Sequence, residues 1–419
     1  MPFDKIPYSF YNKSITMKSR LYFSEPGIAC SAGMTCDDLW KSVRTGNRSG
    51  MKKVVTCTGK EIQAARIEES SLVPSRARYD MKVVRIEEAA LNVLEDAVNR
   101  AVARYGKKRV AVSVGSCDNG SEFSVAGHRA FFSRGIFPSG YALEMQGADY
   151  VASYVKERFG LEGPACTVAT ACSSSAVAII KAAELIEADI ADACIVGGVD
   201  IASDTVLLGF DSLEAVSPEP TNPFSRNRNG ITLGDGAAFF VLSRDYDGKG
   251  APVFLAGCGE SADASHMTAP GADGRGAADA MKEALADSGL RPSDIDYVNL
   301  HGTGTKLNDA MESKAMAEVF GGDIPWCSST KSVTGHTLGA AGALEAAICV
   351  ETLRRNEGRE WSLPMQVWDG QRDESLPELK ITGPENVMGT GDMKYCMTNS
   401  YAFGGSNVSL VIGKEARRG

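Results

Sequence analysis

One cysteine and two histidines stand in sequence contexts that suit acyl-transfer chemistry. Cys172 lies in TACSSSAVAII (170–180), where small residues lead directly into an apolar segment, and this pattern predicts a tight turn at the start of a helix. The positive end of a helix stabilises a thiolate, so we expect a lowered thiol pKa. Backbone N–H groups in such a turn also bind an oxyanion. The alternative role for Cys172 is that of an inert core residue.

The two histidines lie in turns rich in glycine and threonine. The sequence has four histidines; His301 opens HGTGTKLNDAMESKA (301–315), and His336 lies in STKSVTGHTLGAAGALEA (329–346). Neither turn has the spacing of metal ligands, so zinc is not expected. We predict that both side chains act as N–H donors to a substrate carbonyl, and that His128 and His266 are structural.

Alternating strands and helices must position these residues. Runs of β-branched residues at 109–114 and 194–199 alternate with alanine-rich helical patterns at 176–188 and 278–287, which predicts a layered α/β fold. A segment rich in Pro, Asn and Arg at 217–230 predicts a loop before a strand at 237–243.

The chain is predicted to have two similar halves. Residues 166–186 and 326–353 share one outline, a short strand, a small-residue turn and an alanine-rich helix. If these units face each other about a pseudo-twofold axis, Cys172 and His336 converge on one cavity. We expect an extension over 1–20, a first half over 21–250 with the nucleophile, and a second half over 251–419 with both catalytic histidines.

Bulk properties exclude several other classes of protein. The 419 residues are 43% hydrophobic and 23% charged, as in a globular protein, and the net charge of -9 argues against nucleic-acid binding. No apolar run reaches the roughly 18 to 20 residues of a membrane-spanning helix. Eleven cysteines without CxxC pairs, and an N-terminus without the features of a signal peptide, predict reduced thiols in the cytoplasm.

Four motifs in order along the chain resemble the β-ketoacyl synthase family of the thiolase superfamily: TACSS (170–174), HGTGT (301–305), KSVTGH (331–336) and NSYAFGGSN (399–407). The resemblance begins near residue 21 and covers nearly the whole remaining chain. It implies an α/β thiolase-like fold, with two βαβαβαββ halves in a five-layer α-β-α-β-α sandwich. Two histidines, in place of one histidine and one asparagine, resemble the elongating (I/II) type.

The resemblance implies a decarboxylative Claisen condensation. Cys172 would hold an acyl group, with the N–H groups of Cys172 and Phe403 as the oxyanion hole. His301 and His336 would hydrogen-bond the malonyl thioester carbonyl and stabilise the enolate that forms as carbon dioxide leaves. Phe403 also matches the aromatic gate beside the nucleophile.

Further matched positions imply supporting roles and partners. Lys331 resembles a family lysine that pairs with a glutamate, here Glu312, to support the histidines. Thr303 and Thr305 match positions that contact the pantetheine arm. No cofactor is expected besides the phosphopantetheine that carries the substrates. The implied partners are an acyl carrier protein and a second subunit, either an identical chain or a chain-length factor.

Departures from the family pattern bear on the substrate. Ser175 and Ala402 replace usual glycines, so the gating loop is expected to open less freely. Asp118 in GSCDNG (115–120) aligns with the far end of the acyl pocket, where a carboxylate is costly beside an alkyl chain. Either Asp118 faces away, or the acyl group has a polar or aromatic end. The segment 210–224 resembles synthases of aryl-polyene pathways.

Two other functions compete with this interpretation. A non-catalytic chain-length factor would keep the fold without the nucleophile, whereas Cys172, His301 and His336 are all present. A thiolase or hydrolase acting on coenzyme A thioesters would also use a cysteine. A thiolase needs a second cysteine near its C-terminal motif, and NSYAFGGSN has none.

Overall fold

The predicted strands and helices are present, with small shifts at their ends. The computed structural model describes residues 20–75, 80–118, 120–246, 248 and 250–415, so the predicted extension over 1–20 lies outside the described residues except for Arg20. Five elements match the sequence patterns, namely β5 (Val110–Gly115), α5 (Ser174–Glu187), β7 (Ala193–Asp200), β9 (Gly236–Ser243) and α7 (Arg275–Ser288).

Four strands of the first half lie in the order β6-β5-β7-β9, with β6 (Ala165–Val168) at the edge of the sheet. The strands β6, β5 and β7 run parallel, whereas β9 is antiparallel to β7. Two N-terminal strands, β1 (Leu21–Phe23) and β2 (Gly27–Cys30), pair with β9. Parallel strands place their carboxyl ends at one edge, and the turn with Cys172 follows β6 there.

The second half repeats this order and these directions. Its strands are β10 (Val253–Ala262), β11 (Tyr297–Asn299), β12 (Trp326–Ser328), β15 (Tyr395–Tyr401) and β16 (Ser406–Lys414), in the order β12-β11-β15-β16-β10. Here too the first three strands run parallel and the next is antiparallel. The two halves that the sequence repeat predicts therefore share their strand order and strand directions. Because β1 pairs with both β9 and β10, the two halves form one continuous 11-stranded sheet.

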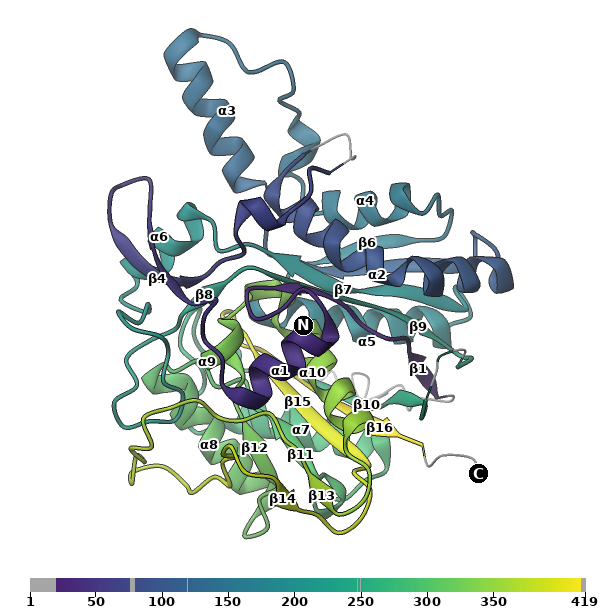
Figure 1. The fold of residues 1–419 in the computed structure, drawn as a ribbon, viewed down its shortest axis with the longest axis vertical. Helices are drawn as coiled ribbons and strands as arrows, with labels where there is room; N and C mark the ends of the chain where they lie inside the picture. Colours follow the sequence, from purple (N-terminus) through teal and green to yellow (C-terminus); the bar gives the residue numbers. More distant parts are fainter. Residues whose placement is uncertain (1–19, 76–79, 119, 247, 249, 416–419) are drawn as a thin grey trace, which may run out of the picture.

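Helices form three layers around these strands, as Figure 1 shows. The helices α5 and α10 (Ala341–Arg355) contact strands of both halves and form the middle layer. The helices α2 (Lys82–Tyr105) and α4 (Tyr150–Arg158) cover the first half, and α7 and α8 (Lys306–Phe320) cover the second. This arrangement is the predicted five-layer sandwich.

The middle helices explain the alanine-rich sequences. In α10, all residues from Ala341 to Leu353 are buried. A helix that is covered on every side is mostly apolar, and the two buried carboxylates of α10, Glu345 and Glu351, form ion pairs. Small side chains let neighbouring layers approach closely. None of the helices within the described ranges is long and apolar enough to cross a membrane.

One helix leaves the body of the molecule. The helix α3 (Ser121–Arg134) projects away from the layers at the top of Figure 1, and Gly127 is its single buried residue. The remaining elements of the described residues are short: α1 (Cys36–Thr45), β3 (Lys52–Val55), β4 (Glu61–Ala65), α6 (Asp204–Ser212), β8 (Leu233–Gly234), α9 (Lys331–Thr334), β13 (Glu360–Trp361), β14 (Val387–Met388) and five 3₁₀ turns. Two of these turns, Ala171–Ser173 and Leu338–Ala340, border the candidate site.

Candidate active site

Cys172 lies in a constrained turn at the N-terminus of α5. It is part of the 3₁₀ turn Ala171–Ser173, and Ala171 has a φ of 52°, in the left-handed region that alanine rarely adopts. The hydroxyl of Ser174 holds this conformation, because it accepts from the N–H of Thr170 at 2.9 Å and donates to the carbonyl of Ala171 at 2.6 Å. The predicted strand, turn and helix are thus all present.

The second half has a matching turn that lies against the first. The 3₁₀ turn Leu338–Ala340 leads into α10 as the turn at Cys172 leads into α5, and Leu338 has a φ of 54°. The two turns are in contact. His336 comes two residues before Leu338, so the pseudo-symmetric fold brings His336 beside the nucleophile, as the repeat predicts.

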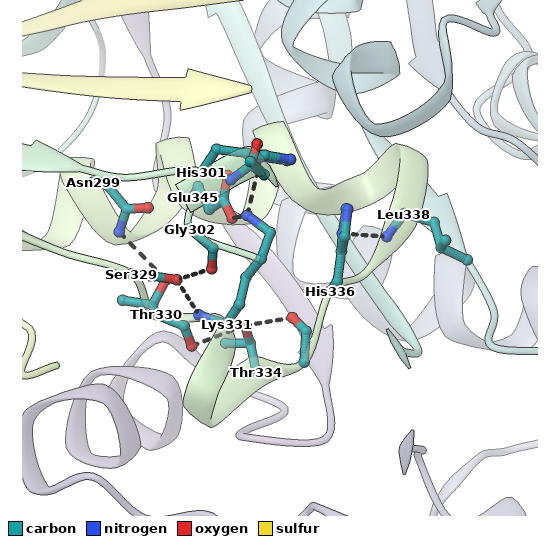
Figure 2. A network of polar contacts seen from close by, with 12 residues as sticks. Asn299, His301, Gly302, Ser329, Thr330, Lys331, Thr334, His336, Leu338 and Glu345 are labelled. Carbon is teal, nitrogen blue, oxygen red and sulfur yellow. Dashed lines mark hydrogen bonds and ion pairs between the residues drawn. The ribbon is translucent and has the colours of Figure 1, made fainter. Parts of the chain in front are cut away.

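The backbone fixes the tautomer of His336. Its Nδ1 accepts a hydrogen bond from the N–H of Leu338 at 3.2 Å, as Figure 2 shows. Because Nδ1 accepts, the proton of the neutral ring is on Nε2. The main chain of His336 is also held in place, because its N–H donates to the carbonyl of Thr232, the residue before β8, at 2.7 Å.

A buried lysine fixes the tautomer of His301 in the same way. The Nζ of Lys331 lies 3.3 Å from Nδ1 of His301, and an ammonium can only donate (Figure 2). The proton of this ring is therefore also on Nε2. The two imidazole rings lie 5.3 Å apart between centroids and are nearly perpendicular. The site thus has two Nε2–H donors from two separate loops.

Both histidines are neutral at pH 7. Burial lowers the pKa of His301 well below 6.5, and the charge of Lys331 and the proximity of His336 lower it further. Burial and Lys331 have the same effect on the pKa of His336. A neutral ring with Nδ1 occupied can stabilise negative charge through Nε2–H without first losing or gaining a proton.

The predicted pair between Lys331 and Glu312 is wrong. Lys331 forms a buried ion pair with Glu345 of α10 instead (Figure 2). Glu312 accepts from the N–H groups of His301 and Gly302, both at 2.8 Å, so it still supports the histidine loop, through the backbone. Sequence reasoning missed Glu345, although a single carboxylate within the apolar run GAAGALEAAICV (339–350) was a signal that a buried cation would pair with it.

The expected lowering of the Cys172 pKa is also wrong. Burial raises the pKa of Cys172 to about 11, while the charge of Lys331 and the backbone N–H of Phe403 act in the opposite direction. The thiol is therefore protonated at pH 7. Its reactivity depends on the groups around it in the cavity, and the Phe403 N–H already points at the sulfur as an oxyanion donor would.

One cavity of about 470 Å³ brings most of the predicted residues together. It is lined by Cys172, His301, Thr303, Thr305, His336 and Phe403. The ring of Phe403 stacks on that of Phe210 from α6, with 5.6 Å between ring centroids. Phe403 is 37% exposed, so this aromatic pair lies where the cavity meets the surface. His128 and His266 do not line this cavity within the described part of the chain.

Asp118 lies apart from these residues. It is buried, but its carboxylate accepts from the hydroxyl of Tyr150 at 2.8 Å and the N–H of Gly120 at 2.6 Å. It lines a separate hollow at the base of α3 together with Lys82 and Glu122. In this chain Asp118 therefore faces away from the cavity of Cys172, which was one of the two alternatives for it.

The departure at Ser175 has a structural explanation. The hydroxyl of Ser175 accepts from the N–H of Ala343 at 2.8 Å, so it links α5 to α10 across the middle layer. The first orphan N–H groups of a helix need such acceptors when they are buried. At the second departure, in the gating loop, the backbone carbonyl of Ala402 accepts a hydrogen bond from the N–H of Gly405.

Replacement of Lys331 by methionine is expected to lower stability and to shift the pH profile. Burial raises the pKa of Glu345 to about 7, and without Lys331 its ionised carboxylate would be buried without a cation, which costs up to about 3 to 5 kcal/mol in unfolding free energy. Lys331 lowers the pKa values of His301 and His336, so its removal raises both, and the acidic limb of any activity that needs neutral rings moves to higher pH. Urea unfolding and a pH profile of malonyl decarboxylation measure the two effects.

The double variant Lys331→Met with Glu345→Gln separates the two effects. It removes both charges, so stability should return towards that of the native protein while the histidine pKa values stay raised. If the double variant is as unstable as the single one, the cost does not come from an unpaired Glu345.

Comparison with known proteins agrees with this geometry. The model of the beta-ketoacyl synthase N-terminal domain matches residues 27–248, and that of the C-terminal domain matches residues 253–357. The chain is 32% identical to nodulation protein E of Rhizobium sp. (strain N33) and 31% identical to 3-oxoacyl-[acyl-carrier-protein] synthase 2 of Vibrio cholerae, with 94% of this chain and 99% of the relative covered in both cases.

A solved structure is similar over nearly the whole chain. The ketosynthase ApeO of Xenorhabdus doucetiae, solved in complex with its chain length factor ApeC, has 36% sequence identity and a TM-score of 0.85, covering 95% of this chain and 98% of the other. Two family models that together span most of the chain, and relatives above 30% identity over 94% of it, leave one conclusion: the chain belongs to the β-ketoacyl synthase family.

Proposed function

We propose that this chain condenses a malonyl unit with an acyl group held on Cys172, and that both substrates arrive on the phosphopantetheine arm of an acyl carrier protein. The observation that carries the proposal is the pair of Nε2–H donors, fixed by Leu338 and Lys331, in the cavity of a buried thiol. No other cofactor is needed. The site of action is proposed to be the cytoplasm.

The first step transfers the acyl group. The sulfur of Cys172 attacks the acyl thioester carbonyl, and the N–H groups of Cys172 and Phe403 stabilise the oxyanion. The bond to the carrier sulfur breaks, and the thiol proton of Cys172 passes to that leaving sulfur.

The second step generates the carbon nucleophile. His301 and His336 donate from Nε2 to the thioester carbonyl of the malonyl group. The bond between the methylene carbon and the carboxylate breaks, carbon dioxide leaves, and the electron pair moves onto the carbonyl oxygen as an enolate. Two prearranged donors on buried rings stabilise that charge strongly.

The third step forms the product. The enolate carbon attacks the acyl-Cys172 carbonyl, and the same two backbone N–H groups bind the new oxyanion. Its collapse breaks the carbon–sulfur bond and releases a β-ketoacyl thioester that is two carbons longer. The Cys172 thiolate takes up a proton, as its raised pKa favours, and the site returns to its starting state.

A second subunit is part of the proposal. The edge strand β6 exposes Ala165 and Cys166 close to the nucleophile turn, and an unpaired edge is a surface for another chain. The α3 segment exposes Phe132 and Ile136, with 82% and 68% of their surface accessible. Apolar exposure of this extent marks an interface. The partner is either an identical chain or a chain-length factor, as in the similar ApeO complex.

The acyl group belongs to fatty-acid or aryl-polyene elongation. The position of Asp118 is no argument for an acyl group with a polar end, because within a single chain Asp118 lines a different hollow. The support for an aromatic end comes from the segment 210–224, where Phe210 and Leu213 line the cavity beside Phe403. An aryl group can stack on such a ring pair.

Loading with matched carrier proteins tests the proposal. The protein is incubated with malonyl-carrier protein and with one of two acyl-carrier proteins, one saturated and one aryl-ended, and the mass on Cys172 and the product length are followed. An adduct on Cys172 and a two-carbon extension are expected. Loading of the saturated chain alone would exclude the aryl-polyene assignment. No adduct with either donor would overturn the condensing activity itself.

A further inference from the structure

A single stretch of chain lines the cavity from the catalytic histidine to the surface. His301, Thr303, Thr305, Lys306 and Leu307 all line it. His301 and Thr303 are buried, Thr305 is half-buried, and Lys306 and Leu307 are exposed. Successive residues of this stretch therefore mark successive depths along the cavity, from the reacting carbonyl to solvent.

Lys306 is the one lysine or arginine among the described residues that line the cavity. Within the described ranges its ammonium has no hydrogen-bond or ion-pair partner. The nearby Arg228, in contrast, is used internally, because it pairs with Asp373 and donates to the carbonyl of Lys306. The carboxylate of Asp263 is likewise occupied, by the N–H of Gly271 and the amide of Asn407. The other acidic residue that lines the cavity, Glu214, is exposed, so the mouth presents one cation, Lys306, together with one surface carboxylate.

We propose that Lys306 binds the phosphodiester group by which the pantetheine arm is attached to its carrier protein. The inference rests on the proposed function and adds a specificity site to it. An arm with its thioester at His301 and His336 places its amide groups beside the hydroxyls of Thr303 and Thr305. Its phosphate then lies at the outer end, where Lys306 is.

An ammonium on a flexible stem is suited to this ligand. Lysine binds phosphate as a point charge and needs no fixed geometry, so it tolerates an arm that enters and leaves in each half-reaction. Because Lys306 is exposed, the interaction is screened by salt. The site would favour substrates that carry the phosphate over simple thioesters.

Donors with and without the phosphate test the inference. The native protein and Lys306→Met are compared with malonyl-pantetheine, malonyl-4'-phosphopantetheine and malonyl-carrier protein, each with a pre-loaded acyl-Cys172. The substitution is expected to lower kcat/KM about 3- to 10-fold for the two phosphate-bearing donors and to leave malonyl-pantetheine unchanged. The difference should shrink as the salt concentration rises.

Two further variants make the result specific. Lys306→Arg keeps a cation and should retain most of the preference for the phosphate. Lys314→Met removes another exposed cation of α8, one whose ammonium donates to the carbonyl of Ala272, and should leave the preference unchanged.

The remaining outcomes count against the inference. An equal loss of kcat/KM with malonyl-pantetheine would show that Lys306 maintains the structure of the cavity mouth and does not bind the phosphate. A loss with the carrier protein but not with free malonyl-4'-phosphopantetheine would mean that Lys306 contacts the carrier itself. No loss with any donor would also overturn it. Inactivity of the native protein with all three donors is a different result, because it overturns the proposed function as well.

Discussion

Replacement of Cys172 by alanine is expected to stop condensation, with a loss of about 10⁴-fold or more. The thiol forms the acyl intermediate, and no other side chain in the described cavity is a thiol or a serine. Incubation with an acyl-carrier protein should give no mass increase on the variant, whereas the native protein gains one acyl group. Intact-protein mass and product length measure the two effects.

The control for this variant is an exposed thiol that does not line the cavity. Cys57, between β3 and β4, is exposed, and Cys57→Ala should load normally. The Cys172→Ala variant should still release carbon dioxide from malonyl-carrier protein, because both Nε2–H donors remain. An acyl adduct on Cys172→Ala, or normal elongation by it, would place the nucleophile elsewhere.

Replacement of His336 by alanine is expected to slow carbon dioxide release from malonyl-carrier protein by about 10²- to 10³-fold. The variant loses one of two donors to the enolate oxygen, while the turn that holds Cys172 keeps its hydrogen bonds. Acyl loading should therefore continue. Carbon dioxide release and the mass on Cys172, measured on the same sample, separate the two half-reactions.

His301→Ala should behave in the same way, since its Nε2–H is the second donor. His266→Ala is the matched control, because His266 does not line the cavity; its Nδ1 accepts from the N–H groups of Thr268 and Ala269 and lies 3.5 Å from the Thr268 hydroxyl. If His336→Ala and His301→Ala fail to load acyl groups yet decarboxylate normally, the assignment of the two half-reactions is reversed.

The pH dependence follows from the same side chains. Burial holds the pKa values of His301 and His336 well below 6.5, so both rings stay neutral as the pH falls from 8 towards that value. The histidines should therefore add no change in carbon dioxide release over this range, and the nearby group that titrates there is Glu345, whose pKa burial raises to about 7. Because the pKa values of both rings are lower in the folded protein than in the unfolded chain, the buried rings contribute to stability at neutral pH, and this contribution decreases as the pH falls below about 6.5. A rate that halves near pH 6.5 in Glu345→Gln as well would contradict neutral, buried histidines.

Local sequence patterns predicted the elements that position the site. The runs at 109–114 and 194–199 became β5 and β7, and the alanine-rich segment at 176–188 became α5. Such patterns succeed because strand and helix periodicity are properties of neighbouring residues. The repeat of 166–186 in 326–353 likewise predicted two facing turns, since similar segments in a pseudo-symmetric fold meet at its axis.

Residue type and motif spacing also determined the chemistry. Cys172, His301, Thr303, Thr305, His336 and Phe403 line one cavity although more than 230 residues separate the first from the last. Each lies in a short turn rich in glycine, serine or threonine; the turns of Cys172, His301 and Phe403 follow β6, β11 and β15, whereas His336 follows α9. Parallel strands place such turns at one edge within each half, and the pseudo-twofold arrangement of the two halves brings these edges together.

Only the tertiary structure decided the partners and charge states within the site. Lys331 pairs with Glu345, and not with Glu312, because α10 passes behind the histidine loop in the middle layer. The pKa of Cys172 is raised because burial removes water from the thiol, an effect that outweighs the charge of Lys331 and the backbone N–H of Phe403. Pairing and burial depend on which distant segments meet, and a linear sequence holds no direct measure of either. The sequence by itself determined which groups react; the packing of the two halves determined how each one is charged and held.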